Sequence, residues 1–171
     1  VKQDKELYAA DFASRISVDD TETLRVVHAY DVRHVTALTR SGDERHVYAG
    51  TITGDVAVID TDTRRLARVA TGARIRSLAL NSDDRTLYVA GLYSGLLALD
   101  TATRAVRRLS ALPCPIAVAH ATAVPRLYVN YQCSGPGGRP GHDAVDVVDT
   151  ATNTSLGAIV GLPNVGGEIA V

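Results

Sequence analysis

The chain repeats one short motif four times: Leu7-Tyr8-Ala9-Ala10, Val47-Tyr48-Ala49-Gly50, Leu87-Tyr88-Val89-Ala90 and Leu127-Tyr128-Val129-Asn130. The four tyrosines are spaced 40 residues apart. A second motif, Asp-Thr-x-Thr, follows the first three tyrosines at a constant distance and occurs once more near the C-terminus, starting at Asp20, Asp60, Asp100 and Asp149. The last copy is displaced because Gln132 to Asp143 carries an insertion. A fixed period of this length predicts stacked copies of one supersecondary unit.

Each repeat reads as four short strands separated by turn residues. In the third repeat the predicted strands are Ile75–Leu80, Leu87–Ala90, Leu96–Leu99 and Ala105–Leu109. Clusters of Asn, Ser, Asp, Gly and Thr lie between them, and these residue types favour turns. Four antiparallel strands in about 40 residues describe a propeller blade. No segment has a sustained apolar period of 3.6 residues, so we expect little or no helix.

The sequence therefore predicts an all-β fold, a β-propeller of four blades with four antiparallel strands each. A chain of 171 residues suits a single domain, 1–171, with repeats at approximately 6–45, 46–85, 86–125 and 126–171. The chain starts on a second strand, and its last residues, Glu168–Val171, resemble the inner strand Pro115–Val118. Three arrangements stay open: part of a larger ring, a closed four-blade ring, or half of a dimeric eight-blade ring.

These motifs resemble the YVTN-type β-propeller repeat family. The resemblance is carried by Leu87-Tyr88-Val89-Ala90 and by Val58-Ile59-Asp60-Thr61-Asp62-Thr63, and it covers almost the whole chain. The family includes surface-layer proteins, exported binding proteins and parts of larger enzymes, and related propellers include sugar-lactone hydrolases. The resemblance implies an exported protein, in the periplasm, on the cell surface or outside the cell. A cytoplasmic protein is the alternative.

Composition and charge narrow the classes of partner. The formal net charge is −1, so no overall field attracts nucleic acid or an anionic membrane. No apolar run approaches 18 residues, so we expect no membrane span. The apolar residues are mainly Val, Ala, Leu and Ile, with one Phe and no Trp. Val and Ile favour strands because a branched side chain packs well on a pleated surface.

Residues that recur in every repeat are interpreted as structural. Tyr supplies apolar area between blades, and the Asp of the Asp-Thr-x-Thr motif accepts hydrogen bonds from nearby amides in its turn. The four aspartates belong to four separate turns and cannot converge on one metal ion. We predict no metal site, no cofactor and no catalytic residue.

Residues that occur in one repeat only can serve a ligand. The loops at one end of the blades gather a locally basic, partly aromatic rim on a chain that is almost neutral overall. Such a rim suits a small anionic ligand or an acidic protein surface, because guanidinium groups pair well with carboxylates and phosphates. A solvated loop face is the alternative. The predicted ligand-binding residues are Tyr30, Arg33, His34, Arg74, Arg76, Tyr131, Arg139 and His142.

The two cysteines are predicted to form a disulfide. If Ile116–Ala119 and Arg126–Asn130 form a hairpin, the sequence numbers of any two facing residues add up to about 247. The numbers of Cys114 and Cys133 also add up to 247, so these two residues would face each other just beyond the hairpin ends. A disulfide there would hold the insertion and would imply an oxidising compartment. The alternative is two reduced thiols.

The sequence favours a non-catalytic binding or interaction module. One alternative is a lactone-hydrolase-like enzyme or the propeller subunit of a redox enzyme. For a metal in the central channel the only candidates are His120 and Glu168, which lie in different repeats. Another alternative is a structural repeat of an envelope or surface-layer protein. The partners left open are a ligand, a protein, a second copy of the chain and further blades of a longer chain.

Overall fold

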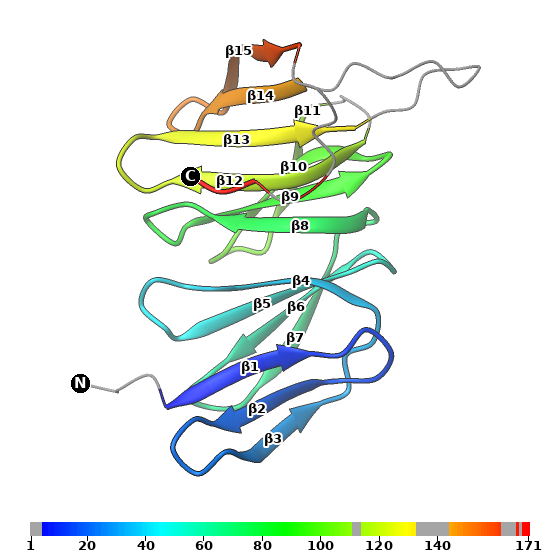
Figure 1. Cartoon of the computed structure of the whole chain (residues 1–171), viewed down its shortest axis with the longest axis vertical. Coiled ribbons are helices and arrows are strands. Elements are labelled where there is room, and N and C mark those ends of the chain that lie inside the picture. Colours follow the sequence, from blue (N-terminus) through cyan, green and yellow to red (C-terminus); the bar gives the residue numbers. More distant parts are fainter. Residues whose placement is uncertain (1–4, 111–113, 133–143, 162–166, 168) are drawn as a thin grey trace.

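The computed structural model describes residues 5–110, 114–132, 144–161, 167 and 169–171. Within these residues the protein consists of strands and turns, with no helix. The strands form one three-stranded and three four-stranded antiparallel sheets, arranged one after another along the molecule (Figure 1). Each sheet is a meander in which neighbours in sequence pair. The predicted all-β fold with four blades is confirmed.

The first sheet contains β1 (Glu6–Ala10), β2 (Ile16–Asp20) and β3 (Arg25–Tyr30). The second contains β4 (Val35–Arg40), β5 (His46–Thr51), β6 (Asp55–Asp60) and β7 (Leu66–Ala70). The third contains β8 (Arg74–Leu80), β9 (Thr86–Leu92), β10 (Gly95–Asp100) and β11 (Val106–Ser110). The fourth contains β12 (Pro115–Ala121), β13 (Arg126–Tyr131), β14 (Ala144–Asp149) and β15 (Thr154–Val160).

The blades are offset from the sequence repeats by one strand. The repeat at 6–45 supplies the whole first sheet and also β4, the inner strand of the second blade. The first blade has no inner strand among the described residues. Residues 169–171, which resemble an inner strand, belong to no sheet in the structure.

Three apolar cores lie between the four blades. Tyr48 and Tyr88 are almost completely buried, each in the core between its own blade and the next. Tyr8 packs in the same way, less completely, against the core between the first and second blades. The neighbouring side chains Val47 and Leu87 point to the opposite face and pack against the preceding blade. The second strands β5 and β9 therefore hold their sheets between two others, because side chains alternate between the two faces of a strand.

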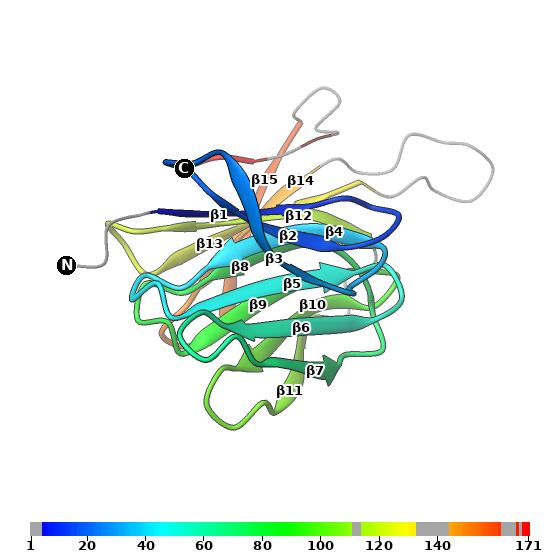
Figure 2. The same cartoon turned by 90° about the horizontal axis from the view of Figure 1, so that it is seen from below.

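The blades form an open arc rather than a closed ring. The first and fourth blades lie at opposite ends of the molecule (Figure 1). In Figure 2 the outer strands β7 and β11 lie at the lower edge of the view, whereas β15 points to the upper edge. The sheets thus fan out from the inner strands. The structure rules out the arrangement in which these four blades close on themselves.

The Asp-Thr-x-Thr motifs form turns that the aspartate carboxylates stabilise. Asp60 Oδ1 accepts the backbone N–H groups of Asp62 and Thr63, at 3.0 and 2.7 Å. The carboxylates of the other three copies accept the corresponding amides, which confirms the structural interpretation. The hydrogen bond from the Thr63 amide is the main cause that lowers the pKa of Asp60, and the pKa values of the other three aspartates are lowered in the same way.

Truncation of a tyrosine in an inter-blade core should destabilise the protein. The Tyr88→Ala variant is expected to lower the free energy of unfolding by about 3–5 kcal/mol, as is typical of buried aromatic residues. The control is Tyr93→Ala on the same blade, since Tyr93 is 73% exposed. Its expected effect is below about 0.5 kcal/mol. Urea unfolding monitored by circular dichroism measures the unfolding free energies of both variants. Equal losses of unfolding free energy in the two variants would contradict the packing of Tyr88 between two blades.

The turn aspartates should make stability depend on acid pH. A lowered folded-state pKa gives stability that is fully present above the unfolded pKa, about 3.9, and is lost as the pH falls through the folded pKa. The difference in unfolding free energy between wild type and Asp60→Asn should therefore be larger at pH 7 than at pH 2.5. Asp20→Asn and Asp100→Asn should behave alike. A difference that stays constant with pH would argue against carboxylate capping.

Candidate functional site

One end of the arc is formed by loops that are joined by backbone hydrogen bonds. The His34 N–H donates to the Phe12 carbonyl at 2.8 Å, and the Ile52 N–H donates to the His34 carbonyl at 3.0 Å. In the next blade the Thr71 N–H donates to the Gly54 carbonyl at 2.8 Å. These bonds connect the loops after second strands with the loops before inner strands. The resulting loop face is the one on which the rim was predicted.

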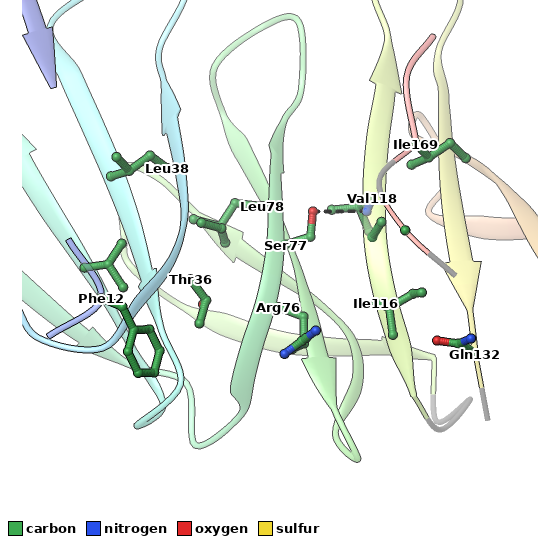
Figure 3. Close-up of a pocket in the computed structure, with 14 residues that line it drawn as sticks. Phe12, Thr36, Leu38, Arg76, Ser77, Leu78, Ile116, Val118, Gln132 and Ile169 are labelled. Atoms are coloured by element: carbon green, nitrogen blue, oxygen red, sulfur yellow. Dashed lines mark hydrogen bonds between the residues drawn. The ribbon is translucent and has the colours of Figure 1, made fainter. Parts of the chain in front are cut away.

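A groove of about 820 Å³ runs along the inner strands β4, β8 and β12 and opens at the loop face. Most of the described residues that line it are apolar, although polar atoms make up more of its exposed surface than apolar atoms. Ile169, near the C-terminus, is part of the lining. Figure 3 shows Phe12, Arg76 and Gln132 toward the same end of the groove, with Arg76 between the other two. The described lining consists of Phe12, Val35, Thr36, Ala37, Leu38, Arg76, Ser77, Leu78, Ile116, Ala117, Val118, Gln132, Gly167 and Ile169.

Two hydroxyl groups of the groove are used to join the inner strands. Thr36 donates to the Ile75 carbonyl at 2.7 Å, which ties β4 to β8. Ser77 Oγ accepts the Val118 N–H at 3.2 Å, which ties β8 to β12. The other two polar side chains of the described lining, Arg76 and Gln132, form no such bridge between inner strands. Arg76 is also the only ionisable side chain among these lining residues.

The three predicted arginines that the structure describes are all exposed on the loop face, but their surroundings differ. Arg33 donates to Asp31 at 3.2 Å, with 67% of its side chain exposed, so its charge is already paired in solvent. Arg74 and Arg76 form no ion pair with another described residue. Both lie on β8, two residues apart at a β-bulge between Ile75 and Ser77, and Arg76 lies in the groove.

Tyr30 and Tyr131 do not join the exposed rim, because both side chains are buried. Tyr30 is 5% exposed in the core between the first and second blades, and Tyr131 is 6% exposed in the core between the third and fourth. Burial raises the pKa of Tyr30. Near it, Arg64 donates to the hydroxyl of Tyr8 at 3.0 Å and pairs with Glu6, which joins the two blades. These tyrosines contribute packing area to the cores between blades.

An aromatic pair that includes one unpredicted residue lies at the end of the groove. Phe12 and His34 meet edge to face, with ring centroids 5.4 Å apart. Phe12 is 56% exposed. Two sequence features could have identified Phe12 as a candidate. It is the single Phe of the chain, and it falls in a turn, where an apolar side chain has no core to enter. Gln132 was also missed, because it was assigned to the insertion.

The predicted residues Arg139 and His142, together with Cys133, lie outside the described residues. Cys114 is partly buried and has no disulfide within the described part of the chain. The hairpin of β12 and β13 has the predicted register, with Ala117 opposite Asn130. A β-bulge between Pro115 and Ala117 then changes the register toward the open end of the hairpin. Beyond the bulge the Gln132 N–H donates to the Cys114 carbonyl at 3.1 Å. The bulge shifts the pairing by one residue, so Cys114 lies beside Gln132.

Among the described residues, no group of three or more His, Cys, Asp or Glu side chains is placed to hold a metal ion. Nor does this part of the chain contain a helix long and apolar enough for a membrane crossing. His120 is partly buried on β12, and burial lowers its pKa. Glu168, the other candidate for a channel metal, lies outside the described residues.

No protein-family model and no curated protein sequence matches this chain. Solved structures do match. Hydrazine synthase of Kuenenia stuttgartiensis superposes with a TM-score of 0.80 and 18% identity over 91% of this chain and 46% of that one. The β-propeller domain of Cps50 (Swd1) from Myceliophteria thermophila superposes with a TM-score of 0.75 and 13% identity. The match covers 91% of this chain and 52% of that domain. U3-55K superposes with a TM-score of 0.64 and 13% identity, over 80% of this chain and 42% of that one.

This chain has a β-propeller fold. It spans about half the length of the chains that it matches. At these identities the similarity shows the fold and carries no information on activity. The four blades therefore correspond to an arc of the longer propeller chains, in agreement with the open arrangement of the first and fourth blades.

The disulfide prediction can be checked by mass. With a Cys114–Cys133 bond, alkylation of the unfolded protein without reductant should leave the intact mass unchanged, and addition of a reductant should allow two alkyl groups to attach. The Cys114→Ser variant is the control, since its remaining thiol should react without reductant. Two alkyl groups on the unreduced wild type would show that the bond is absent.

Proposed function

We propose that the protein is a non-catalytic binding module whose loop face and groove receive an anionic group carried on an apolar body. The observation that carries this proposal is the charge of the groove. A single guanidinium, that of Arg76, is set among lining residues that are mostly apolar, and the described lining contains no carboxylate. An arginine in such surroundings binds carboxylate, sulfonate or phosphate oxygens through two parallel N–H donors.

Other residues at this end support an amphiphilic ligand or a partner side chain of that kind. The Phe12–His34 pair offers an aromatic surface, and Leu38, Leu78 and Val118 line the groove behind it. Pockets of this composition bind ligands mainly through apolar contact, with a few polar groups that set orientation. Arg74 and the exposed Tyr93 extend the same face outward, and Tyr and Arg are the residues enriched at binding hot spots.

A rigid scaffold makes the site suitable for recognition. The backbone hydrogen bonds between loops and the bridges from Thr36 and Ser77 fix the inner strands on which Arg76 stands. A backbone held in this way needs little rearrangement when a ligand binds. The resemblance to YVTN-type repeats supports an exported location for this module, and that inference rests on the sequence motifs alone.

Binding can be tested with a matched pair of fluorescent probes. Anilinonaphthalene sulfonate carries one anionic group on an aromatic body, and phenylnaphthylamine is its neutral analogue. Arg76→Ala is expected to weaken binding of the sulfonate about tenfold, the range for a hydrogen bond to a charged group. Binding of the neutral probe should change little. Fluorescence titration at constant ionic strength measures both affinities.

Two control variants complete this test. Arg33→Ala removes a guanidinium from the same face that is already paired with Asp31, and it should leave sulfonate binding unchanged. Arg76→Lys should restore only part of the affinity, because a lysine cannot form the two-pronged contact. Equal losses for both probes, or equal effects of the Arg33 and Arg76 variants, would show that the groove does not select an anion.

A further inference from the structure

The inner strands β4, β8 and β12 all contain the same β-bulge. The register shifts between positions 35 and 37, between 75 and 77, and between 115 and 117. The residues left without an opposite residue on the second strand are Thr36, Arg76 and Ile116, which are spaced by the sequence period of 40. A bulge of this kind turns a side chain away from the regular alternation of the strand. The fold therefore provides one redirected side chain at the same place in each of three blades.

All three bulged residues line the groove. Figure 3 shows them in a row across the end of the groove that opens at the loop face, with Arg76 in the middle. Phe12 lies on the side of Thr36, and Gln132 lies on the side of Ile116. We call these five residues the mouth of the groove. The mouth is built from all four described blades, since Phe12 belongs to the first and Gln132 to the fourth.

The bulged side chains have three different chemistries. Thr36 donates to the Ile75 carbonyl at 2.7 Å and to the Gly50 carbonyl at 3.2 Å, so its hydroxyl serves the contact between blades. Arg76 carries a charge, and the described lining contains no carboxylate to pair with it. Ile116 has no polar group in its side chain. The same bulge forms with three unlike residues, so the fold does not require the guanidinium of Arg76 or the apolar group of Ile116.

Across the mouth, an aromatic ring, a cation and an aliphatic side chain follow one another. Phe12 is 56% exposed, with one edge of its contact surface covered by His34. Ile116 is partly exposed at the other side of Arg76. A partner that contacts all three side chains needs one anionic group between two apolar groups.

The spacing of the inner strands fits an extended chain that crosses them. Cα atoms of β4 and β8, and those of β8 and β12, approach each other to within 8 Å. An extended chain advances by about 3.3 Å per residue, so two residues cover about 6.6 Å. Side chains two residues apart also point to the same face of an extended chain. Alternate side chains of a crossing segment therefore match the three blades in both distance and direction.

Gln132 can bind the backbone of such a segment. Its side chain is exposed at the end of the row, and an amide group both donates and accepts hydrogen bonds. An extended segment brings one N–H and one C=O group per residue, and these groups need partners when they are removed from water. A neutral amide beside Ile116 meets that need without a second charge.

We infer that the groove binds an extended segment of another protein, in which an acidic residue lies between two apolar residues, each two positions away from it. The carboxylate of the segment binds Arg76. One apolar side chain packs on Phe12, and the other packs on Ile116. This segment is the anionic ligand of the proposed function, on which its binding rests. All the residues involved belong to the described blades, so binding does not depend on how many blades the full protein contains.

Three blocked peptides test the charge and the spacing. The first is acetyl-Gly-Trp-Ser-Asp-Ser-Leu-Gly-amide. The second, acetyl-Gly-Ser-Trp-Asp-Leu-Ser-Gly-amide, has the same composition with the apolar residues next to Asp, and the third has Asn in place of the Asp of the first. Titration of the peptide Trp fluorescence measures the affinities, since the protein contains no Trp.

The first peptide should bind most tightly. Its affinity should exceed that of the Asn peptide about tenfold, the range for a hydrogen bond to a charged group. It should exceed that of the second peptide about fivefold, because apolar side chains next to Asp point to the opposite face of an extended chain and lose their contacts.

Protein variants locate the contacts. Arg76→Ala should remove the preference for Asp over Asn. Phe12→Ser should weaken binding of the first peptide about fivefold through the lost apolar contact. The matched control is Leu66→Ser, which removes a 36% exposed apolar side chain on the outer strand β7 and should leave binding unchanged. Circular dichroism verifies that each variant is folded.

The outcomes distinguish this partner from the proposed function itself. If anilinonaphthalene sulfonate binds through Arg76 but the first and second peptides bind equally, or neither binds, the groove takes a small anionic amphiphile and the extended partner is excluded. Equal effects of Phe12→Ser and Leu66→Ser would also exclude it. If sulfonate binding does not depend on Arg76, the proposed function and the extended partner are both wrong.

Discussion

Apolar packing between successive sheets is the interaction on which this protein depends. Each sheet is too small to bury both of its faces by itself, and the second strand of each blade projects a tyrosine forward and an aliphatic residue backward. The three cores formed in this way hold four sheets in line. Stability in such an array is approximately a sum of blade and interface contributions, so an interface missing at either end leaves apolar area in solvent.

The same packing creates the groove. Because the sheets fan out from their inner strands, β4, β8 and β12 lie side by side and their outward side chains line one concave surface. The hydroxyl bridges from Thr36 and Ser77 hold these strands together. They also engage the two hydroxyl groups of the described lining, in which Arg76 is the one ionisable side chain. The chemical character of the groove thus follows from how neighbouring blades are joined.

The candidate site was predicted only in part. The loop face could be predicted from the phase of the repeats, and Arg33, His34, Arg74 and Arg76 are exposed on it. Tyr30 and Tyr131 were assigned to the same face because they adjoin its loops. Their side chains instead turn into inter-blade cores, since the direction of a strand residue depends on a register that loop position does not reveal. The bulge at Pro115, which shifts Cys114, has no signal in the sequence.

The sequence by itself determined the blade count, the strand order and the role of the repeated Tyr and Asp residues. These features are encoded locally, by a period of two within each strand and by turn residues at fixed spacing. Only the tertiary structure decided that the four blades form an open arc, that Phe12 and Arg76 share one groove, and that two tyrosines are buried. Those properties depend on the angle between sheets and on packing between residues about 40 positions or more apart in the chain.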